Sequence, residues 1–446
     1  MATASQSRPL LEAFGWAGSS RAKSSRQEAV KKDAGPLTQS ILAICGVLIP
    51  IAVCLYLSDL EPLFELKSVE FIHPDVVVIF MVLLVAARAL IKGLPSLPKR
   101  LGWAFALFFL ASAASAVFAG DKLRAAAAIV QMFEFVAIAW CVSLITSARL
   151  LKRILQSIIA LFALESLIAI WQFADLDLAR GTFFNNQKYS MFMGSGAAIC
   201  FAMFTQEKDA TRRWTYFTIM LLILGGALVG QERAPWVAFV LSAIVVSWIS
   251  KGRRKALLIW VIATILVGVL AVTTIEPLRE KTFSRIAEVN VQTEKRNTLL
   301  SRLAVWGVAV KLFAEHPLLG VGPKNFVTMV PSFLTSDEMG GLESADPHNV
   351  WIGILAEGGI IGFAAYVWLC YSIYLVGRRA IDDPRCANIK PLLMGCIAYE
   401  VFWFAMSYHY FTKGEGHIHF LIIGMCVGAQ RALMSRPEKR LAANAA

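Results

Sequence analysis

The chain has 446 residues, of which 57% are hydrophobic and 17% are charged, whereas a soluble domain is about 45–50% apolar and about 25% charged. This composition excludes an ordinary soluble protein and predicts an integral membrane protein. The net charge of +12 would suit a nucleic-acid-binding protein, but the basic residues lie mainly in the tails and alternate links, where they act as topology signals.

In chain order, the first 36 residues are rich in Ser, Ala, Lys and Arg without apolar periodicity, and predict a disordered cytoplasmic tail rather than a signal peptide. Apolar segments of spanning length follow. We predict twelve membrane-spanning helices, at about residues 37–58, 74–92, 101–119, 125–146, 151–174, 188–205, 214–230, 234–250, 256–273, 349–376, 391–412 and 416–433. The predicted fold is therefore an all-α polytopic helix bundle over 37–433, with a cytoplasmic tail at 434–446.

The link between the ninth and tenth predicted spans, Thr274–His348, is much longer than any other link. The tails and the links on one side hold 28 of the 43 Lys and Arg residues, and only seven of the others lie outside this long loop. The positive-inside bias therefore predicts cytoplasmic termini and an outward loop, periplasmic in a Gram-negative cell. Within the loop, residues 297–314 predict an amphipathic helix able to lie on the bilayer. Its apolar stripe consists of Leu299, Leu303, Trp306, Val310 and Phe313.

Three arginines on the predicted outward face have no evident topology role: Arg180 after the fifth span, Arg233 in a short turn, and Arg302 in the amphipathic helix. One such arginine alone is most often a snorkelling or carboxylate-paired side chain. Three of them near one face, beside His348, indicate an anionic ligand, because guanidinium donates two parallel hydrogen bonds to phosphate oxygens. A diphosphate at the membrane surface would fit.

Two pairs of residues resemble metal motifs but fit them poorly. His417 and His419 are two residues apart, so on a helix they point in different directions. Asp175 and Asp177 form the Asp-x-Asp pattern of nucleotide-sugar transferases, but they lie on the predicted outward side, and nucleotide sugars are cytoplasmic. The eight cysteines lie in spans or a cytoplasmic link, which disfavours a cysteine metal site or a disulfide framework. We expect no metal and no cofactor.

Other residues near the ends of the loop are predicted to be structural. His316 precedes a proline in a turn, and the Gly320-x-Gly322 pattern follows no strand, so we predict a turn and not a dinucleotide loop. His348 could also act only as a cap of the tenth span, but Asn349 is the better N-cap residue.

Four glutamates fall within predicted spans, where carboxylates are costly and usually paired or functional. One hypothesis is that Glu165 and Glu357 orient His348 or an arginine; helix-to-helix hydrogen bonding is an equal alternative. The four are Glu134, Glu165, Glu357 and Glu400.

Several short motifs follow one another on the outward side. They are Arg-Gly-Thr-Phe at 180–183, Arg-Ala at 233–234, His-Pro-Leu-Leu-Gly-Val-Gly-Pro at 316–323, Pro-His-Asn at 347–349 and Leu-Ala-Glu-Gly-Gly-Ile-Ile-Gly at 355–362. Their order, spacing and sidedness resemble the O-antigen ligase and polymerase superfamily, over about residues 150–430.

The resemblance implies a GT-C-like glycosyltransferase in the bacterial inner membrane. It would transfer a glycan from undecaprenyl diphosphate to an acceptor hydroxyl, with inversion and without a metal. His348 would act as the general base, while Arg180, Arg233 and Arg302 would hold the diphosphate, with Glu165, Glu357 and Asn349 as supporting residues. These residue types suit the chemistry, because histidine has an ordinary pKa of about 6.5 and fixed cations stabilise a leaving anion.

The resemblance leaves the acceptor open. The Arg-Gly-Thr-Phe-Phe-Asn-Asn form at 180–186 favours a ligase that acts on lipid A-core; the alternative is an O-antigen or exopolysaccharide polymerase, and a protein O-oligosaccharyltransferase is less favoured. A twelve-span transporter is also disfavoured. Such proteins usually have two similar six-span halves, often with the longest link between them, and here the link after the sixth span is short.

Overall fold

The structure is a computed structural model, and most of the chain between residues 64 and 434 can be described. The described residues are 64–66, 69–71, 73–92, 97–145, 147–173, 179–183, 186–230, 232, 234–250, 254–274, 276, 279–280, 298–335, 345–382, 389–406 and 415–434. The first predicted span (37–58), the first tail, the second tail after residue 434, Arg233, Asp175 and Asp177 lie outside them.

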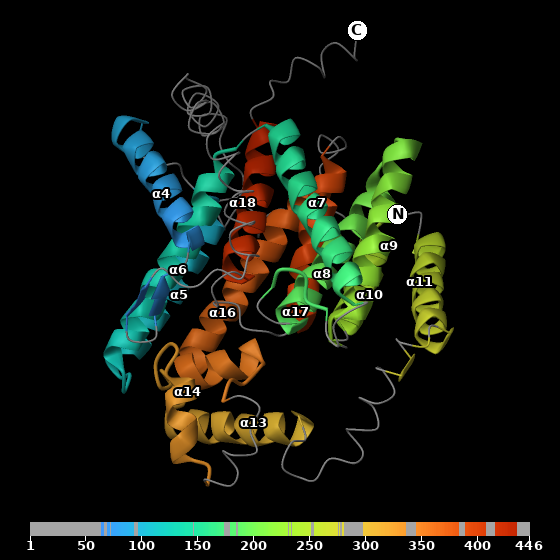
Figure 1. Cartoon of the computed structure of the whole chain (residues 1–446). Helices are drawn as coiled ribbons and strands as arrows, with labels where there is room; N and C mark the ends of the chain where they lie inside the picture. The colour runs from blue at the N-terminus through green and yellow to red at the C-terminus, as the bar shows by residue number, and fades with distance from the viewer. Residues whose placement is uncertain are drawn as a thin grey trace, which may run out of the picture.

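Within the described residues, eleven helices coincide with eleven of the predicted spans (Figure 1). They are α4 (His73–Lys92), α5 (Lys99–Val117), α6 (Lys122–Ser143), α7 (Ala148–Gln172), α8 (Asn186–Gln206), α9 (Ala210–Val229), α10 (Ala234–Ile249), α11 (Arg254–Thr274), α16 (Val350–Asp382), α17 (Lys390–Met406) and α18 (Glu415–Met434).

The predicted mostly helical membrane protein is confirmed, because five described helices are long and apolar enough to cross a membrane: α5, α6, α7, α16 and the part of α11 from Leu257. The count of twelve spans and the GT-C-like fold stay predictions. One addition to the all-α prediction is a small antiparallel hairpin, in which β1 (Phe64–Leu66) pairs with β2 (Val69–Phe71).

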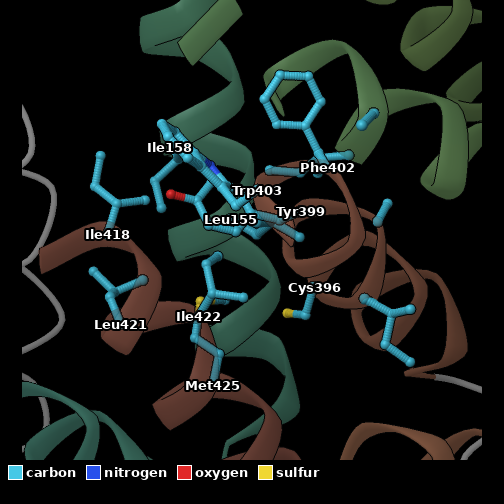
Figure 2. Packing of buried hydrophobic residues seen from close by; sticks show 14 of the residues in the cluster. Leu155, Ile158, Cys396, Tyr399, Phe402, Trp403, Ile418, Leu421, Ile422 and Met425 are labelled. Carbon is cyan, nitrogen blue, oxygen red and sulfur yellow. The ribbon is translucent and has the colours of Figure 1, made fainter. Parts of the chain in front are cut away.

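The core lies between α7, α8, α17 and α18. Figure 2 shows Leu155 and Ile158 of α7 packed with Tyr399 and Phe402 of α17 and Ile422 of α18. Helix α8 is buried around nearly its whole circumference, as expected for a central helix of a bundle. Outer helices instead expose large apolar side chains, an arrangement that suits lipid rather than water.

The long loop forms a second, smaller hydrophobic cluster at one end of the bundle. Its helix α13 (Thr298–Glu315), predicted at 297–314, lies across that end (Figure 1) and is followed by α14 (Phe326–Met329) and the 3-10 turn η2 (Val330–Ser332). We call this end the site end. The buried face of α13 consists of Val305, Val308, Ala309 and Leu312.

The predicted apolar stripe of α13 is not the face that packs on the protein. Leu303 and Val310 are 49% and 60% exposed, because the helix contacts α16 through the neighbouring face. That the stripe lies on the bilayer stays a prediction.

Candidate functional site

Two of the glycine-rich motifs pair with each other through their backbones. Helix α16 is broken at Gly359, whose φ of 60° and ψ of −164° are not helical. The backbone groups on either side of the break bind the 316–323 segment: Val321 N to Ala356 O (3.1 Å), Gly322 N to Glu357 O (2.9 Å), Ile360 N to Pro317 O (2.9 Å) and Ile361 N to Leu318 O (3.3 Å). The loop thereby satisfies polar groups that would be costly to leave unpaired near a membrane.

The pairing requires glycine on both sides. Gly320 has a φ of 66°, and a Cβ atom there would lie 2.4 Å from the carbonyl carbon of Glu357. A Cβ atom on Gly359 would lie 2.4 Å from the carbonyl carbon of Leu318. Both obstacles are backbone atoms, which cannot move aside as a flexible side chain can. The predicted turn at Gly320 and Gly322 is confirmed, since both have positive φ.

Side chains attach this paired unit to the bundle. Ser115 near the end of α5 donates its Oγ–H to the carbonyl oxygen of Glu357 (2.6 Å). Asn325 accepts a hydrogen bond from the backbone N–H of Asp121 (2.8 Å) and donates one to the carbonyl of Asp121 (3.2 Å). The carboxylate of Glu357 accepts a hydrogen bond from Phe326 N (3.3 Å). That Glu357 also orients His348 or an arginine stays a prediction.

His348 lies directly before α16 in an uncommon backbone conformation. Its φ is 45°, a left-handed value that costs a non-glycine residue about 1–2 kcal/mol. Its backbone N–H donates to Asp346 Oδ1 (3.1 Å). Asn349 Oδ1 accepts hydrogen bonds from the backbone N–H groups of Trp351 (3.0 Å) and Ile352 (3.3 Å), so the predicted N-cap is confirmed. These contacts hold the backbone on both sides of the half-buried His348.

Helix α13 is tied to the same segment by an indole. Trp306 Nε1 donates a hydrogen bond to the carbonyl oxygen of Pro347 (2.7 Å), the residue before His348. Arg302 is four residues before Trp306 and therefore lies on the same face of α13, about one helical turn or about 6 Å along the axis. The half-buried Arg302 is thus held by a rigid helix near the segment that contains His348.

Arg180 lies in a loop that the end of α7 holds by its backbone. Gln172 Oε1 accepts hydrogen bonds from Arg180 N (3.2 Å) and Gly181 N (2.9 Å), and Gln172 Nε2 donates to Gly181 O (2.8 Å). Glu165 accepts from Thr182 N and Thr182 Oγ1, both at 2.8 Å. Because Glu165 and Gln172 are seven residues apart, they lie on one face of α7. We call this set of contacts the α7 clamp.

The α7 clamp depends on close approach and on an aromatic anchor. Gly181 has a φ of 61°, and a Cβ atom there would lie 2.4 Å from Glu165 Oε2. Phe183 is buried, with its ring centroid 5.5 Å from that of Phe192 and 5.7 Å from that of Tyr189. The exposed Arg180 is therefore carried by a loop fixed on both sides.

The sequence-predicted residues that are described share one end of the bundle. Figure 1 places the C-terminal end of α7, which carries the Arg180 loop, at the same end as α13 and the start of α16. Sequence reasoning missed Gln172 and Trp306. Their residue types could have indicated them. Gln172 has an amide near the end of an apolar helix, and Trp306 has an indole N–H, and each of these groups needs a hydrogen-bond partner.

Glu400 is another of the four glutamates within predicted spans, and its partner lies on a neighbouring helix. Its Oε2 lies 2.8 Å from Nε2 of the buried His419, so the pair joins α17 to α18. This contact is a carboxylate–histidine pair between two helices of the bundle.

Parts of the chain are similar in sequence to known proteins. A family model described as O-antigen ligase matches residues 218–367. An O-antigen ligase of Pseudomonas aeruginosa is 32% identical over 150 residues, 33% of this chain and 31% of that protein. An uncharacterized protein of Haemophilus influenzae is 21% identical over 235 residues, 50% of this chain and 58% of that protein. The chain thus covers less than two thirds of either relative. The family match includes α13, the paired glycine motifs and His348.

Proposed function

We propose that the protein is a ligase that transfers a glycan from undecaprenyl diphosphate to a hydroxyl of lipid A-core, a proposal supported by the match of residues 218–367 to the family model described as O-antigen ligase. The reaction takes place on the periplasmic face of the inner membrane, in lipopolysaccharide assembly. The observation that carries the proposal is the arrangement of His348 and Arg302 inside the matched region. The hydrogen bond from Trp306 to Pro347 joins the helix that contains Arg302 to the segment that contains His348.

In the proposed reaction His348 removes the proton from the acceptor hydroxyl. The hydroxyl oxygen forms a bond to the anomeric carbon, on the face opposite to the leaving group, so the configuration inverts. The bond from that carbon to the diphosphate oxygen breaks, and the electron pair leaves with undecaprenyl diphosphate. No metal is assigned a role.

Negative charge develops on the diphosphate as that bond breaks, and fixed cations are most useful there. We assign this role to Arg302, Arg180 and Arg233. The α7 clamp supports the assignment of Arg180, because it holds the loop with four hydrogen bonds to the backbone and one from the Thr182 hydroxyl. Glu165 and Gln172 are then positioning residues rather than catalytic ones.

The experiment that tests the proposal is gene deletion followed by gel analysis of lipopolysaccharide and of lipid-linked glycans. Loss of a ligase should leave bare lipid A-core and accumulated lipid-linked chains, and the unaltered gene should restore the normal pattern whereas a His348→Gln gene should not. Caps of a single repeat unit would indicate a polymerase instead. An unchanged pattern would reject both functions.

A further inference from the structure

At the end of the bundle opposite to the site end, an arginine lies across two aromatic rings. The guanidinium carbon of Arg100, in the first turn of α5, is 4.5 Å from the ring centroid of Trp368 and 5.0 Å from that of Tyr371, both on α16. The two rings are neighbours, with centroids 6.2 Å apart. Since α5 has 19 residues, this cluster is about 28 Å from the contact of Asp121 with Asn325 at the site end.

The rings under Arg100 belong to a girdle that is open to the surroundings. Trp368 and Tyr371 are 40% and 48% exposed, and the nearby Trp103 and Tyr374 are 68% and 50% exposed. Trp and Tyr gather at the level of lipid headgroups, where one part of the ring is apolar and the other is wet. Helix α16 continues past this level to the basic residues Arg378 and Arg379, as expected where a helix leaves the bilayer.

The charge of Arg100 is not neutralised by the described part of the protein. No carboxylate among the described residues forms an ion pair with it, and its buried Nε has no hydrogen-bond acceptor there. The first turn of α5 contains no acidic residue, and the neighbouring Lys99 is exposed. A guanidinium that stacks by its face keeps its N–H donors directed outward in its plane.

We propose that Arg100, held by Trp368 and Tyr371, binds the phosphate of an anionic phospholipid headgroup. Phosphodiester oxygens match the two parallel N–H groups of guanidinium, and the adjacent Lys99 favours a headgroup with net negative charge. The girdle of exposed rings places this donor at headgroup depth. The site stands independently of the proposed glycan transfer, because it lies at the other end of the bundle.

The test is native mass spectrometry of the full chain, released from detergent with equal amounts of phosphatidylglycerol and phosphatidylcholine. We expect bound phosphatidylglycerol to predominate in the wild type. Arg100→Gln should lower the ratio of bound phosphatidylglycerol to phosphatidylcholine about fivefold, the factor that one basic residue contributes at an anionic surface. The matched control is Arg212→Gln, at the same end of the bundle, which should leave the ratio unchanged because the exposed Arg212 stacks on no ring among the described residues.

A second variant removes the rings and keeps the charge. Trp368→Leu with Tyr371→Leu should lower the same ratio about threefold, because the stacking that orients Arg100 is lost. Equal losses in Arg100→Gln and Arg212→Gln, or no loss in the ring variant, would overturn the proposal in favour of diffuse charge attraction. Equal binding of the two lipids by the wild type would also overturn it, as would full displacement by glycerol phosphate. Melting temperatures within a few degrees of the wild type establish that the variants are folded.

Discussion

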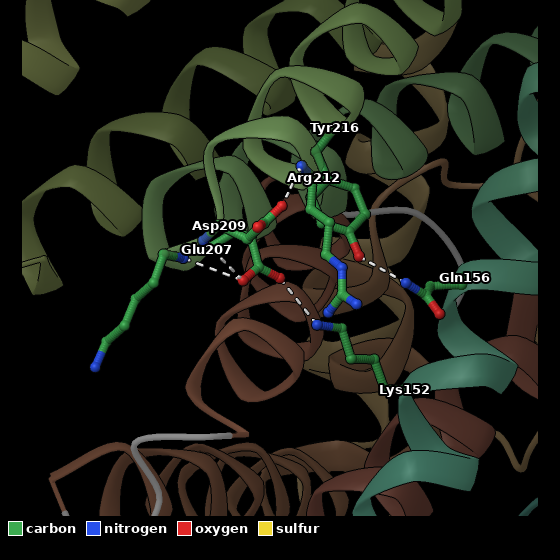
Figure 3. Close-up of polar contacts among 7 residues, drawn as sticks. Lys152, Gln156, Glu207, Asp209, Arg212 and Tyr216 are labelled. Carbon is green, nitrogen blue, oxygen red and sulfur yellow. Dashed lines mark hydrogen bonds and ion pairs between the residues drawn. The ribbon is translucent and has the colours of Figure 1, made fainter.

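The two ends of the bundle are held together by different kinds of contact. At the site end, backbone groups of segments far apart in the chain pair with each other, and positive-φ glycines make the approach possible. At the opposite end, side chains join neighbouring helices: Lys152 Nζ is 2.9 Å from Glu207 Oε2, and Gln156 Nε2 donates to Tyr216 Oη at 2.8 Å (Figure 3). Backbone pairing fixes atoms closely but tolerates few substitutions, whereas side-chain pairing mainly fixes which helix ends meet.

The largest effect is expected on the rate of glycan transfer, when the proposed general base at the site end is replaced. His348→Gln should lower the rate of glycan transfer about 10²–10⁴-fold, the usual contribution of a general base. The measurement is transfer from a lipid-linked glycan to lipid A-core by the purified protein. His316→Gln is the matched control, because His316 is exposed and was predicted to be structural. Equal losses in the two variants would contradict the assignment of the base.

The backbone pairing predicts the next largest effect. Gly320→Ala should lower the free energy of unfolding by about 2–4 kcal/mol, because positive φ and a backbone clash act together. Gly307→Ala on α13 is the control. A Cβ atom there meets nothing within 4 Å, so it should be neutral or stabilise by up to about 1 kcal/mol. Thermal unfolding in detergent measures both variants, and equal stability of the two would show that the pairing is not rigid.

Two glutamines of α7 allow a direct comparison of the ends. Gln172→Leu removes three hydrogen bonds of the α7 clamp and should weaken binding of undecaprenyl diphosphate about tenfold, since Arg180 loses its position. Gln156→Leu removes the Tyr216 contact and should leave this binding unchanged. Binding is measured by a shift in melting temperature with added lipid diphosphate. If Arg180→Gln weakens binding and Gln172→Leu does not, the clamp is only structural.

The smallest effect is expected at the opposite end. Burial raises the pKa of Glu207, but the hydrogen bond and charge of Lys152 and the N–H groups of Asp209 and Lys208 lower it more, so its pKa lies below the ordinary value of 4.5. A carboxyl group with a lowered folded-state pKa stabilises the protein above pH 4.5, and this contribution disappears as the pH falls through the folded-state pKa.

Glu207→Gln should therefore cost about 1 kcal/mol at pH 7 and less at pH 3. Melting temperatures of wild type and variant at both pH values provide the measurement. The same difference at the two pH values would show that the ion pair does not contribute.

Sequence patterns predicted the helices well and the contacts among loops poorly. Apolar runs such as that of α16 are long and continuous, so their positions follow from length and composition alone. The face of α13 that packs on the protein was not predicted, since Leu303 and Val305 are both apolar and only the position of α16 decides which is buried. The α7 clamp was only partly foreseen: Glu165 was named, but the partner of a buried carboxylate depends on a turn that no periodicity reveals.

The broken helix also constrains the order in which the protein is made. The partners of Val321 and Gly322 are Ala356 and Glu357, which leave the ribosome later than the loop they bind. The 316–323 segment must therefore wait, with its polar backbone groups without these partners, until residues 356–361 have been made. A nascent chain that ends before Ala356 should lack all four of these backbone hydrogen bonds.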